Sequence, residues 1–223
     1  MHTENSTLSS IPLEGVPHLW EKNDILVFFI DLDNYDTLSA ENLNNTEIED
    51  LEKLQTSYFK KRFIVSRVIL KHILYTLLNM ESVLNISIYK DIHGGTHISD
   101  HEDLHICISY SENIAVLAIS KVKIGIDVET KRPLELKHTL RYLYNTPSYS
   151  DKSVTDNDFL KIWTLKEAYC KFSNKSMFSF LNKEPDFNNV SCFYFILDEK
   201  YIFSIVAGLG QYTIGMNYLE KFI

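Results

Sequence analysis

The stretch from Lys123 to Glu129 reads KIGIDVE. Its apolar residues occupy every second position, which is the period of a β-strand whose two faces meet different surroundings. One face carries Ile124, Ile126 and Val128, and the other carries Gly125, Asp127 and Glu129. The pattern predicts a strand that buries one face and presents two carboxylates on the other.

A related stretch lies nearer the N-terminus. Residues 29–33 read FIDLD, residues 125–129 read GIDVE, and each stretch ends a predicted strand. A long helical pattern follows in each half, at residues 59–71 and 159–171, so the offsets are 96 residues for the strands and 100 for the helices. Similar offsets are typical of an internal repeat. The hypothesis is a duplicated α+β unit of about 110 residues.

Hydrophobic periodicity predicts the other elements. Helices are expected at residues 46–56, 57–79, 133–143 and 156–172. Strands are expected at residues 25–32, 85–89, 104–109, 114–120, 190–197, 201–207 and 212–218. Residues 1–24 are expected to be irregular, because Pro12 and Pro17 disfavour regular structure.

The charge balance is acidic, with 22 Lys and Arg against 30 Asp and Glu and a formal net charge of −8. Such a chain has no excess of cations to displace counterions, which argues against non-specific nucleic-acid binding. The three cysteines form no CxxC pair, which favours a reducing compartment. No early apolar run is long enough to span a bilayer. We therefore expect a soluble cytoplasmic protein with no nucleic-acid or membrane partner.

The two carboxylates of the predicted strand are candidate metal ligands. Asp127 and Glu129 are next neighbours on one face, about 6–7 Å apart at the backbone. Both side chains can then converge on one hard cation such as Mg²⁺, which prefers oxygen ligands. Gly125 is expected to leave open space beside them. The alternative is a solvated strand face without a ligand.

The helix predicted at residues 158–172 carries charged residues beside its apolar arc. Lys166 falls within the arc, and Glu167 and Lys171 are neighbours on its border, one turn apart. A lysine there can simply extend its ammonium to water, and a Glu–Lys pair at this spacing is usually a surface ion pair. Both alternatives stay open on spacing alone.

The first long helix is rich in cations instead. Lys60, Arg67 and Lys71 share one stripe, and Arg62 lies on another face. If the halves are equivalent, Arg67 corresponds to Glu167, and one cleft would hold cations from one half and carboxylates from the other. That arrangement suits a magnesium-bound polyphosphate.

A second candidate metal site is a row of histidines at intervals of four. The row comprises His93, His97, His101 and His105, and on a helix it would resemble a zinc site. Gly94 and Gly95 interrupt it, so a solvated loop is the better interpretation.

Several of these motifs occur together in one known family. Along the chain these are residues 62–70 (RFIVSRVIL), residues 108–111 (ISYS), residues 125–129 (GIDVE) and residues 163–168 (WTLKEA) with Lys171. This set resembles the 4'-phosphopantetheinyl transferase superfamily of the surfactin-synthetase-activating (Sfp) type, over residues 57–172. The resemblance implies an α+β fold of two similar pseudo-twofold-related lobes in a monomer. We place the lobes at residues 1–115 and 116–223, with the magnesium site on the second.

The resemblance also implies a reaction. The phosphopantetheine arm of coenzyme A would move to a serine of an acyl or peptidyl carrier protein, in fatty acid, polyketide or non-ribosomal peptide biosynthesis, and adenosine 3',5'-bisphosphate would leave. Asp127, Glu129 and Glu167 would bind Mg²⁺, and Glu167 could help to deprotonate the carrier serine. Lys171 would neutralise the attacked phosphate with support from Lys166. Coenzyme A would be bound by Arg62, Arg67, Ser109, Tyr110 and Lys171.

The sequence departs from the family at the nucleotide end. Tyr110 replaces a histidine between two serines, Gly95 replaces a basic residue, and Ser148 replaces a glutamate. Basic residues expected before the first long helix align with Glu52 and Gln55. These departures leave open a non-catalytic relative that binds carrier protein or nucleotide without transfer. A third reading is another magnesium-dependent phosphohydrolase.

Overall fold

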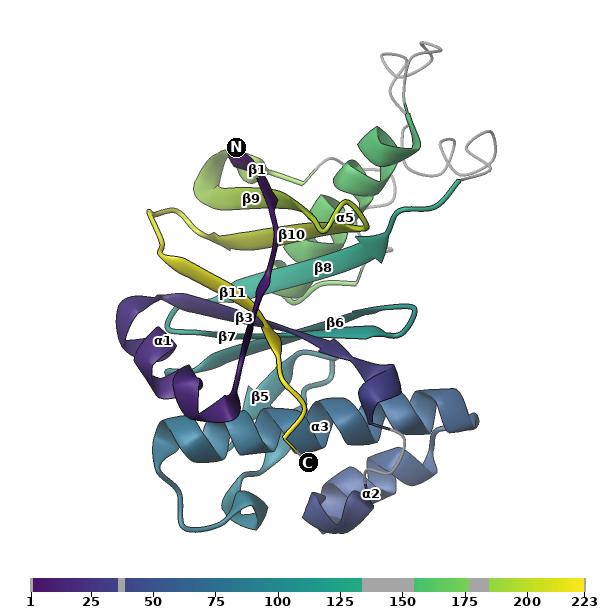
Figure 1. The fold of residues 1–223 in the computed structure, drawn as a ribbon, viewed down its shortest axis with the longest axis vertical. Helices are drawn as coiled ribbons and strands as arrows, with labels where there is room; N and C mark the ends of the chain where they lie inside the picture. Colours follow the sequence, from purple (N-terminus) through teal and green to yellow (C-terminus); the bar gives the residue numbers. More distant parts are fainter. Residues whose placement is uncertain (1, 36–38, 134–154, 177–184, 223) are drawn as a thin grey trace. The chain divides into compact units, whose positions relative to one another are not determined.

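The computed structural model describes residues 2–35, 39–133, 155–176 and 185–222. The chain divides into two compact units (Figure 1). The first, called the β8 unit, comprises Met1–Thr7 and Lys123–Gln211, and the second, the β3 unit, comprises Leu8–Val122 and Tyr212–Ile223. Each unit therefore takes segments from both ends of the chain. The boundary expected after residue 115 falls inside a fully paired strand, β7 (Ile114–Ser120).

The β8 unit is built on one four-stranded sheet. Its order is β1 (His2–Ser6), β9 (Val190–Leu197), β10 (Tyr201–Gly208) and β8 (Ile124–Thr130). β1 pairs parallel with β9, and the other pairs are antiparallel. Helix α5 (Asp156–Ser173) packs against β8 and β10. Its first turn is fixed by a capping box in which Thr155 and Asp158 satisfy each other's backbone N–H groups.

The β3 unit contains a five-stranded sheet. Its order is β2 (Ser9–Ile11), β11 (Ile214–Leu219), β3 (Ile25–Asp31), β7 and β6 (His105–Ser111). The long helix α3 (Ser57–Leu78) buries Val65, Ile69 and Ile73 in a core shared with β3 and β7. Helices α1 (Val16–Lys22) and α2 (Asn45–Glu52) and the hairpin of β4 (Ile88–Lys90) and β5 (Thr96–Ile98) complete the unit.

The two units share one connectivity. In the β8 unit the chain runs β8, α5, β9, β10, and the strands lie in the order β9-β10-β8. In the β3 unit it runs β3, α3, β6, β7, with α2 inserted before α3 and the β4–β5 hairpin inserted before β6, and the strands β6, β7 and β3 lie in the order β6-β7-β3. The fold is thus a mixture of helices and mainly antiparallel sheets compatible with the α+β class. A repeated β-α-β-β core is also what a duplicated unit predicts.

The expectation of an irregular N-terminal arm is wrong. Residues 2–6 and 9–11 form edge strands, and Val16–Lys22 is helical. Pro17 stands in the first turn of α1, where the missing N–H costs no intrahelical hydrogen bond. The helix expected at residues 133–143 lies outside the described residues.

The histidine row does not lie on a helix. His93 belongs to the turn between β4 and β5, His97 to β5, and His105 to β6. Asp91 organises this turn, because one carboxylate oxygen accepts hydrogen bonds from the backbone N–H groups of His93 and Gly95, and the other lies 2.8 Å from His97 Nε2. The helical zinc alternative is therefore wrong.

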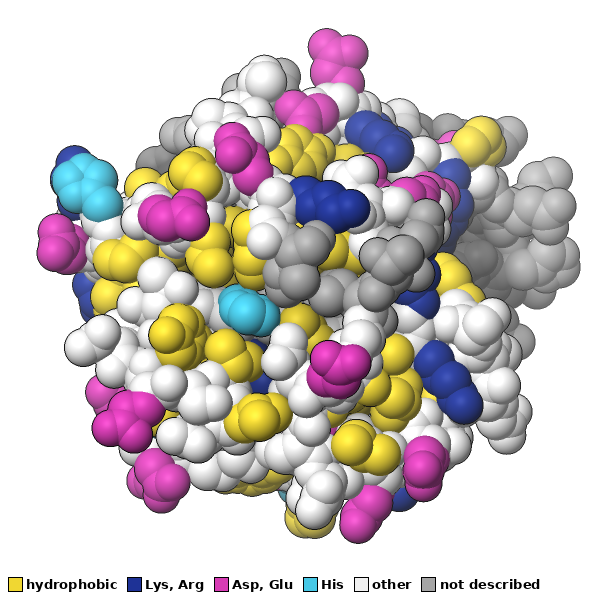
Figure 2. All heavy atoms as spheres, turned by 60° about the horizontal axis from the view of Figure 1, so that its bottom comes forward, with side chains coloured by type: hydrophobic (Ala, Val, Ile, Leu, Met, Phe, Trp, Pro, Cys, Tyr) yellow, Lys and Arg dark blue, Asp and Glu magenta, His cyan; other side chains and the backbone are white. Residues whose placement is uncertain are grey.

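Charge is spread out rather than gathered on the face drawn in Figure 2. Acidic side chains stand singly among neutral and apolar ones there, with few basic side chains between them. Among the described helices, none combines the length and the apolar character needed to cross a bilayer.

Candidate active site

The candidate site of the β8 unit begins with a close approach of helix to strand. A Cβ placed on Gly125 would overlap the carbonyl oxygen of Ala168 and the backbone N of Phe172. The backbone of α5 therefore fills the space beside Gly125, and the expectation of an open space there is wrong. Glycine is needed because any side chain would push the helix away from the strand. The same contact turns the Asp127 face of β8 toward α5.

Replacing Gly125 by alanine is expected to destabilise this contact. Overpacking of this kind costs about 1–3 kcal/mol, and more when backbone has to move. Urea denaturation measures the loss. Gly215→Ala is a matched control, because its new Cβ would meet only side-chain ends of Leu26 and Asn23, at 2.9 and 3.0 Å. Equal losses of unfolding free energy in the two variants would contradict a close contact between the α5 backbone and Gly125.

A buried pair of hydroxyls fixes α5 on the sheet next to the acidic residues. Ser204 stands directly opposite Asp127 in the β10–β8 register. Its Oγ lies 2.8 Å from Thr164 Oγ1, and both residues are fully buried. The sequence analysis named neither Thr164 nor Ser204 as a site residue. A lone serine within the otherwise apolar strand 201–207 could have indicated that Ser204 has a specific polar partner. We regard both as positioning residues, because they touch the helix rather than open surface.

Each of the two acidic residues of β8 forms an ion pair with a basic side chain. Lys171 Nζ donates to Asp127 Oδ1 at 2.8 Å, and Asp127 is only 6% exposed. Arg132 Nη1 donates to Glu129 Oε2 at 3.0 Å. Lys171 thus reaches from α5 to β8, so it is more than a surface partner of Glu167 on its own helix. Arg132 was missed by the sequence analysis, because its i,i+3 spacing to Glu129 continues past the end of the strand.

Glu167 lies close enough to Asp127 and Glu129 for their negative charges to act on it. Its pKa is raised, first by burial and then by the Asp127 carboxylate, while Lys171 lowers it and Glu129 raises it. The structure therefore brings the three candidate ligands into electrostatic contact. In the described ranges, however, no group of three or more His, Cys, Asp or Glu is arranged to hold a metal. The acidic side chains are organised around Lys171 and Arg132 instead.

Lys166 is buried, with 3% of its surface exposed. The alternative in which its ammonium simply extends to water is therefore wrong. The same charges act on Cys170. The pKa of its thiol is raised to about 11, first by burial and then by Glu167, while Lys171 and Lys166 act to lower it. At neutral pH this thiol stays protonated and is a poor nucleophile.

The β3 unit places its candidate residues around the start of α3 and the end of β6. The Arg62 guanidinium lies 4.1 Å from the centre of the Tyr110 ring. Tyr110 Oη lies 2.6 Å from Ser66 Oγ. Ser109 is buried, with 3% of its surface exposed. These residues lie close together, as the resemblance implies, whereas Ser148 lies outside the described residues.

Arg67 is almost fully buried, with 2% of its surface exposed. Burial lowers its pKa, while Tyr110, Glu47 and Asp50 raise it. Its Nη1 has no hydrogen-bond partner among the described residues. A guanidinium in this state carries an uncompensated desolvation cost, which an anionic group would offset.

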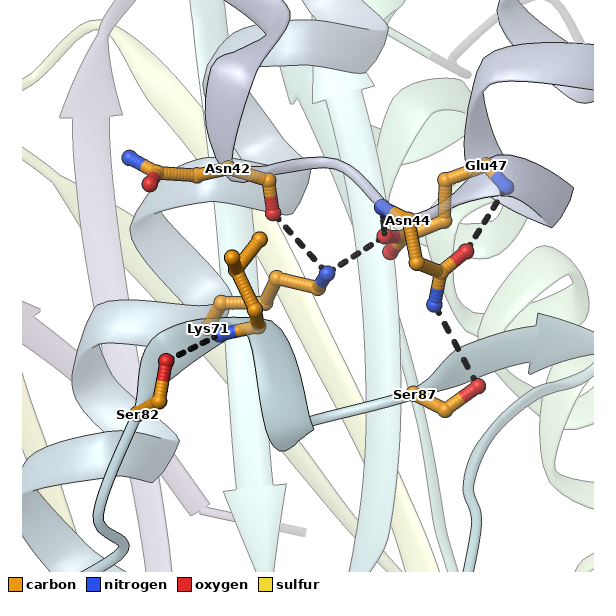
Figure 3. A network of polar contacts seen from close by, with 7 residues as sticks. Asn42, Asn44, Glu47, Lys71, Ser82 and Ser87 are labelled. Carbon is orange, nitrogen blue, oxygen red and sulfur yellow. Dashed lines mark hydrogen bonds and ion pairs between the residues drawn. The ribbon is translucent and has the colours of Figure 1, made fainter.

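Lys71 does not continue the cationic stripe. Its Nζ lies 2.5 Å from Glu47 Oε2 and donates to the carbonyl oxygen of Asn42 at 3.0 Å (Figure 3). Lys71 and Glu47 are 0% and 1% exposed, whereas Lys60 is exposed. The three residues of the predicted stripe therefore lie in three different environments. Of the three, Arg67 alone has a buried nitrogen without a hydrogen-bond partner among the described residues.

Comparison with known proteins confirms the resemblance. No protein-family model matches the chain. It is 28% identical to the 4'-phosphopantetheinyl transferase gsp of Aneurinibacillus migulanus over 127 residues, which are 54% of this chain and 52% of that protein. It is 32% identical over 90 residues to the 4'-phosphopantetheinyl transferase Sfp of Bacillus subtilis (strain 168), covering 38% and 40%. The psf-1 enzyme of Bacillus pumilus is 23% identical over 124 residues, 52% of each chain. The chain thus spans about half or less of these curated relatives.

Proposed function

We propose that this chain is a 4'-phosphopantetheinyl transferase that moves the arm of coenzyme A to a serine of an acyl or peptidyl carrier protein. The observation that carries the proposal is the contact between two separate motifs. Residues 125–129 and 163–171 meet at the β8–α5 contact. There Lys171 forms an ion pair with Asp127, and Glu167 interacts electrostatically with both. The relatives named above support a transferase of this kind.

The donor set suits Mg²⁺, although it does not form a metal cluster as it stands. Asp127, Glu129 and Glu167 offer only carboxylate oxygens, the ligands that Mg²⁺ prefers. Burial raises the pKa of Glu167, and repulsion from Asp127 and Glu129 raises it further; a cation would relieve that repulsion. We propose that these three residues hold the ion. When bound, it would supply positive charge to the pyrophosphate of coenzyme A.

The remaining steps belong to the side chains of this chain. The Glu167 carboxylate accepts the proton of the carrier serine hydroxyl, either directly or through one water. Lys171 moves its ammonium from Asp127 to the phosphate under attack, and Lys166 adds positive charge from the buried side of α5. Catalysis then rests on positioning and charge neutralisation, as in other phosphoryl transfers. The products are a phosphopantetheinylated serine and adenosine 3',5'-bisphosphate.

The finer assignments follow the same proposal. The repeated β-α-β-β core supports two similar lobes, and we propose that they are related by a pseudo-twofold axis in a monomer. Cys107, Cys170 and Cys192 form no disulfide, which supports action in the reducing cytoplasm. Arg62, Arg67, Ser109 and Tyr110 are proposed to bind the nucleotide part of coenzyme A.

Mass spectrometry of a carrier protein tests the proposal. The protein is incubated with coenzyme A, Mg²⁺ and an apo acyl carrier or apo peptidyl carrier protein, and the carrier is weighed. We expect the mass of one phosphopantetheine arm to be added, and a chelator to prevent the addition. No adduct on carriers from several pathways would leave a binding protein without transfer. Release of nucleotide without a carrier would indicate a phosphohydrolase instead.

A further inference from the structure

We propose that Tyr110 works through its ring, which holds the Arg62 guanidinium in place to bind a phosphate group of the nucleotide substrate. The inference rests on the proposed function for the identity of that nucleotide. It assigns the phosphate contact to Arg62 and makes Tyr110 a positioning residue. It refines the expectation that Tyr110 binds coenzyme A, because Tyr110 then acts through Arg62.

Arg62 is held by aromatic rings. Its guanidinium carbon lies 4.1 Å from the ring centre of Tyr110, 5.2 Å from that of Tyr58 and 5.7 Å from that of Phe59. Nη1 is 3.5 Å from Tyr58 Oη, and that hydroxyl donates to the carbonyl oxygen of Glu112 at 2.7 Å. Stacking of this kind orients the guanidinium plane while leaving its N–H edge for a ligand.

No carboxylate neutralises Arg62 within the part of the chain that the structure describes. The ion pairs recorded around it use other cations, such as Lys61 with Asp33 at 3.7 Å and Lys71 with Glu47. An oriented, half-buried guanidinium in this state matches the planar, bidentate geometry of a phosphate group.

The Tyr110 hydroxyl has another partner. Ser66 Oγ donates to the carbonyl oxygen of Phe63 at 3.2 Å, so the 2.6 Å contact between the two hydroxyls is satisfied when Tyr110 Oη donates to Ser66 Oγ. The single proton of the hydroxyl is then used within the protein. The ring face, rather than the hydroxyl, remains as the functional part of Tyr110.

A second arginine near Tyr110 points to the same ligand. Arg67 lies close enough to Tyr110 for the two to interact electrostatically, and its buried Nη1 has no described partner. The charges around it are mixed, because Glu47 and Asp50 attract it and Lys90 repels it. One guanidinium stacked on the Tyr110 ring and a second within electrostatic range of it favour a doubly charged anion, such as a phosphomonoester, over a single carboxylate.

The test measures binding of adenosine 3',5'-bisphosphate by calorimetry, without any carrier protein. Arg62→Ala is expected to weaken binding about 10–100-fold, the range of a charge-assisted hydrogen bond. Tyr110→Leu should weaken it about tenfold because the stacking partner is lost, whereas Tyr110→Phe should retain the affinity within about twofold because the ring remains. Lys22→Ala is the matched control, since it removes one exposed cation of the β3 unit that has no proposed role in binding, and we expect less than about a twofold change.

Two further readouts separate positioning from general loss of structure. The Arg62 Nε–Hε resonance should carry a ring-current shift that disappears in Tyr110→Leu and persists in Tyr110→Phe. The KM for coenzyme A should rise in Arg62→Ala and Tyr110→Leu, with kcat changed much less. Circular dichroism checks that each variant is folded.

Specific outcomes overturn the inference. If Tyr110→Phe weakens binding as much as Tyr110→Leu, the hydroxyl makes the contact. If Arg62→Ala binds like the wild type while transfer proceeds normally, the inference fails and the proposed function stands. If Arg62→Ala and Tyr110→Leu lose affinity but the wild type transfers nothing, the proposed function fails and the inference stands.

Discussion

Replacing Glu167 by glutamine is expected to lower the rate of arm transfer about 10²–10⁴-fold, the contribution of a positioned acid–base group. The variant loses the carboxylate that is proposed to bind Mg²⁺ and to accept the serine proton. Its shape is conserved, so its neighbours on α5 and β8 keep their packing. Initial rates of carrier modification, measured at saturating coenzyme A, give the size of the loss.

The same substitution is expected to leave the fold as stable as before, or more stable. Burial, Asp127 and Glu129 raise the folded-state pKa of Glu167 above the ordinary value of 4.5 for a glutamate. A carboxyl whose pKa rises on folding destabilises the folded state increasingly as pH rises above the unfolded-state pKa. The advantage of Glu167→Gln in unfolding free energy should therefore grow from about pH 4 toward neutrality.

Asp156→Asn provides the matched control for Glu167→Gln. Asp156 lies in the first turn of the same helix, so this substitution removes the same charge from the same element. Its rate is expected to stay within about twofold of the wild type. A Glu167→Gln enzyme that retains more than a tenth of the wild-type rate would contradict the proposed role of the carboxylate.

Replacing Lys71 by methionine is expected to cost about 3–5 kcal/mol of unfolding free energy, because it leaves the buried Glu47 carboxylate without its cation. Lys71 also donates a hydrogen bond to the carbonyl oxygen of Asn42. Asn44 N donates at 3.0 Å to Glu47 Oε2, the oxygen that pairs with Lys71. These contacts join α2 and the segment before it to the middle of α3 (Figure 3). Chemical denaturation monitored by circular dichroism measures the loss.

A double-mutant cycle separates the ion pair from the packing. Adding Glu47→Leu to Lys71→Met removes the unpaired charge and is expected to recover most of the loss. Lys53→Met is the control, because its ion pair with Asp50, at 2.8 Å, is exposed and should leave the unfolding free energy nearly unchanged. A double variant as unstable as Lys71→Met alone would show that the cost comes from lost packing.

Regular patterns in the sequence predicted most of the elements. The alternation of residues 124–129 gave a strand within one residue of β8, and the periodicity of residues 57–79 matched α3 closely. Such patterns are local, because a strand or helix repeats its orientation every two or 3.6 residues. The edge strands β1 and β2 were missed because their short polar segments carry no such period.

By itself, the sequence determined which residue types are neighbours along each element. It placed two carboxylates on one strand face, a Lys–Glu–Lys set on one helix (Lys166, Glu167 and Lys171) and arginines on the other helix. Only the tertiary structure decided their partners. It placed the α5 backbone against Gly125 and paired Asp127 with Lys171. It also buried Lys71 with Glu47 and stacked Arg62 on Tyr110. The physical reason is that spacing sets direction along one element, whereas burial and pairing depend on which other element packs against it.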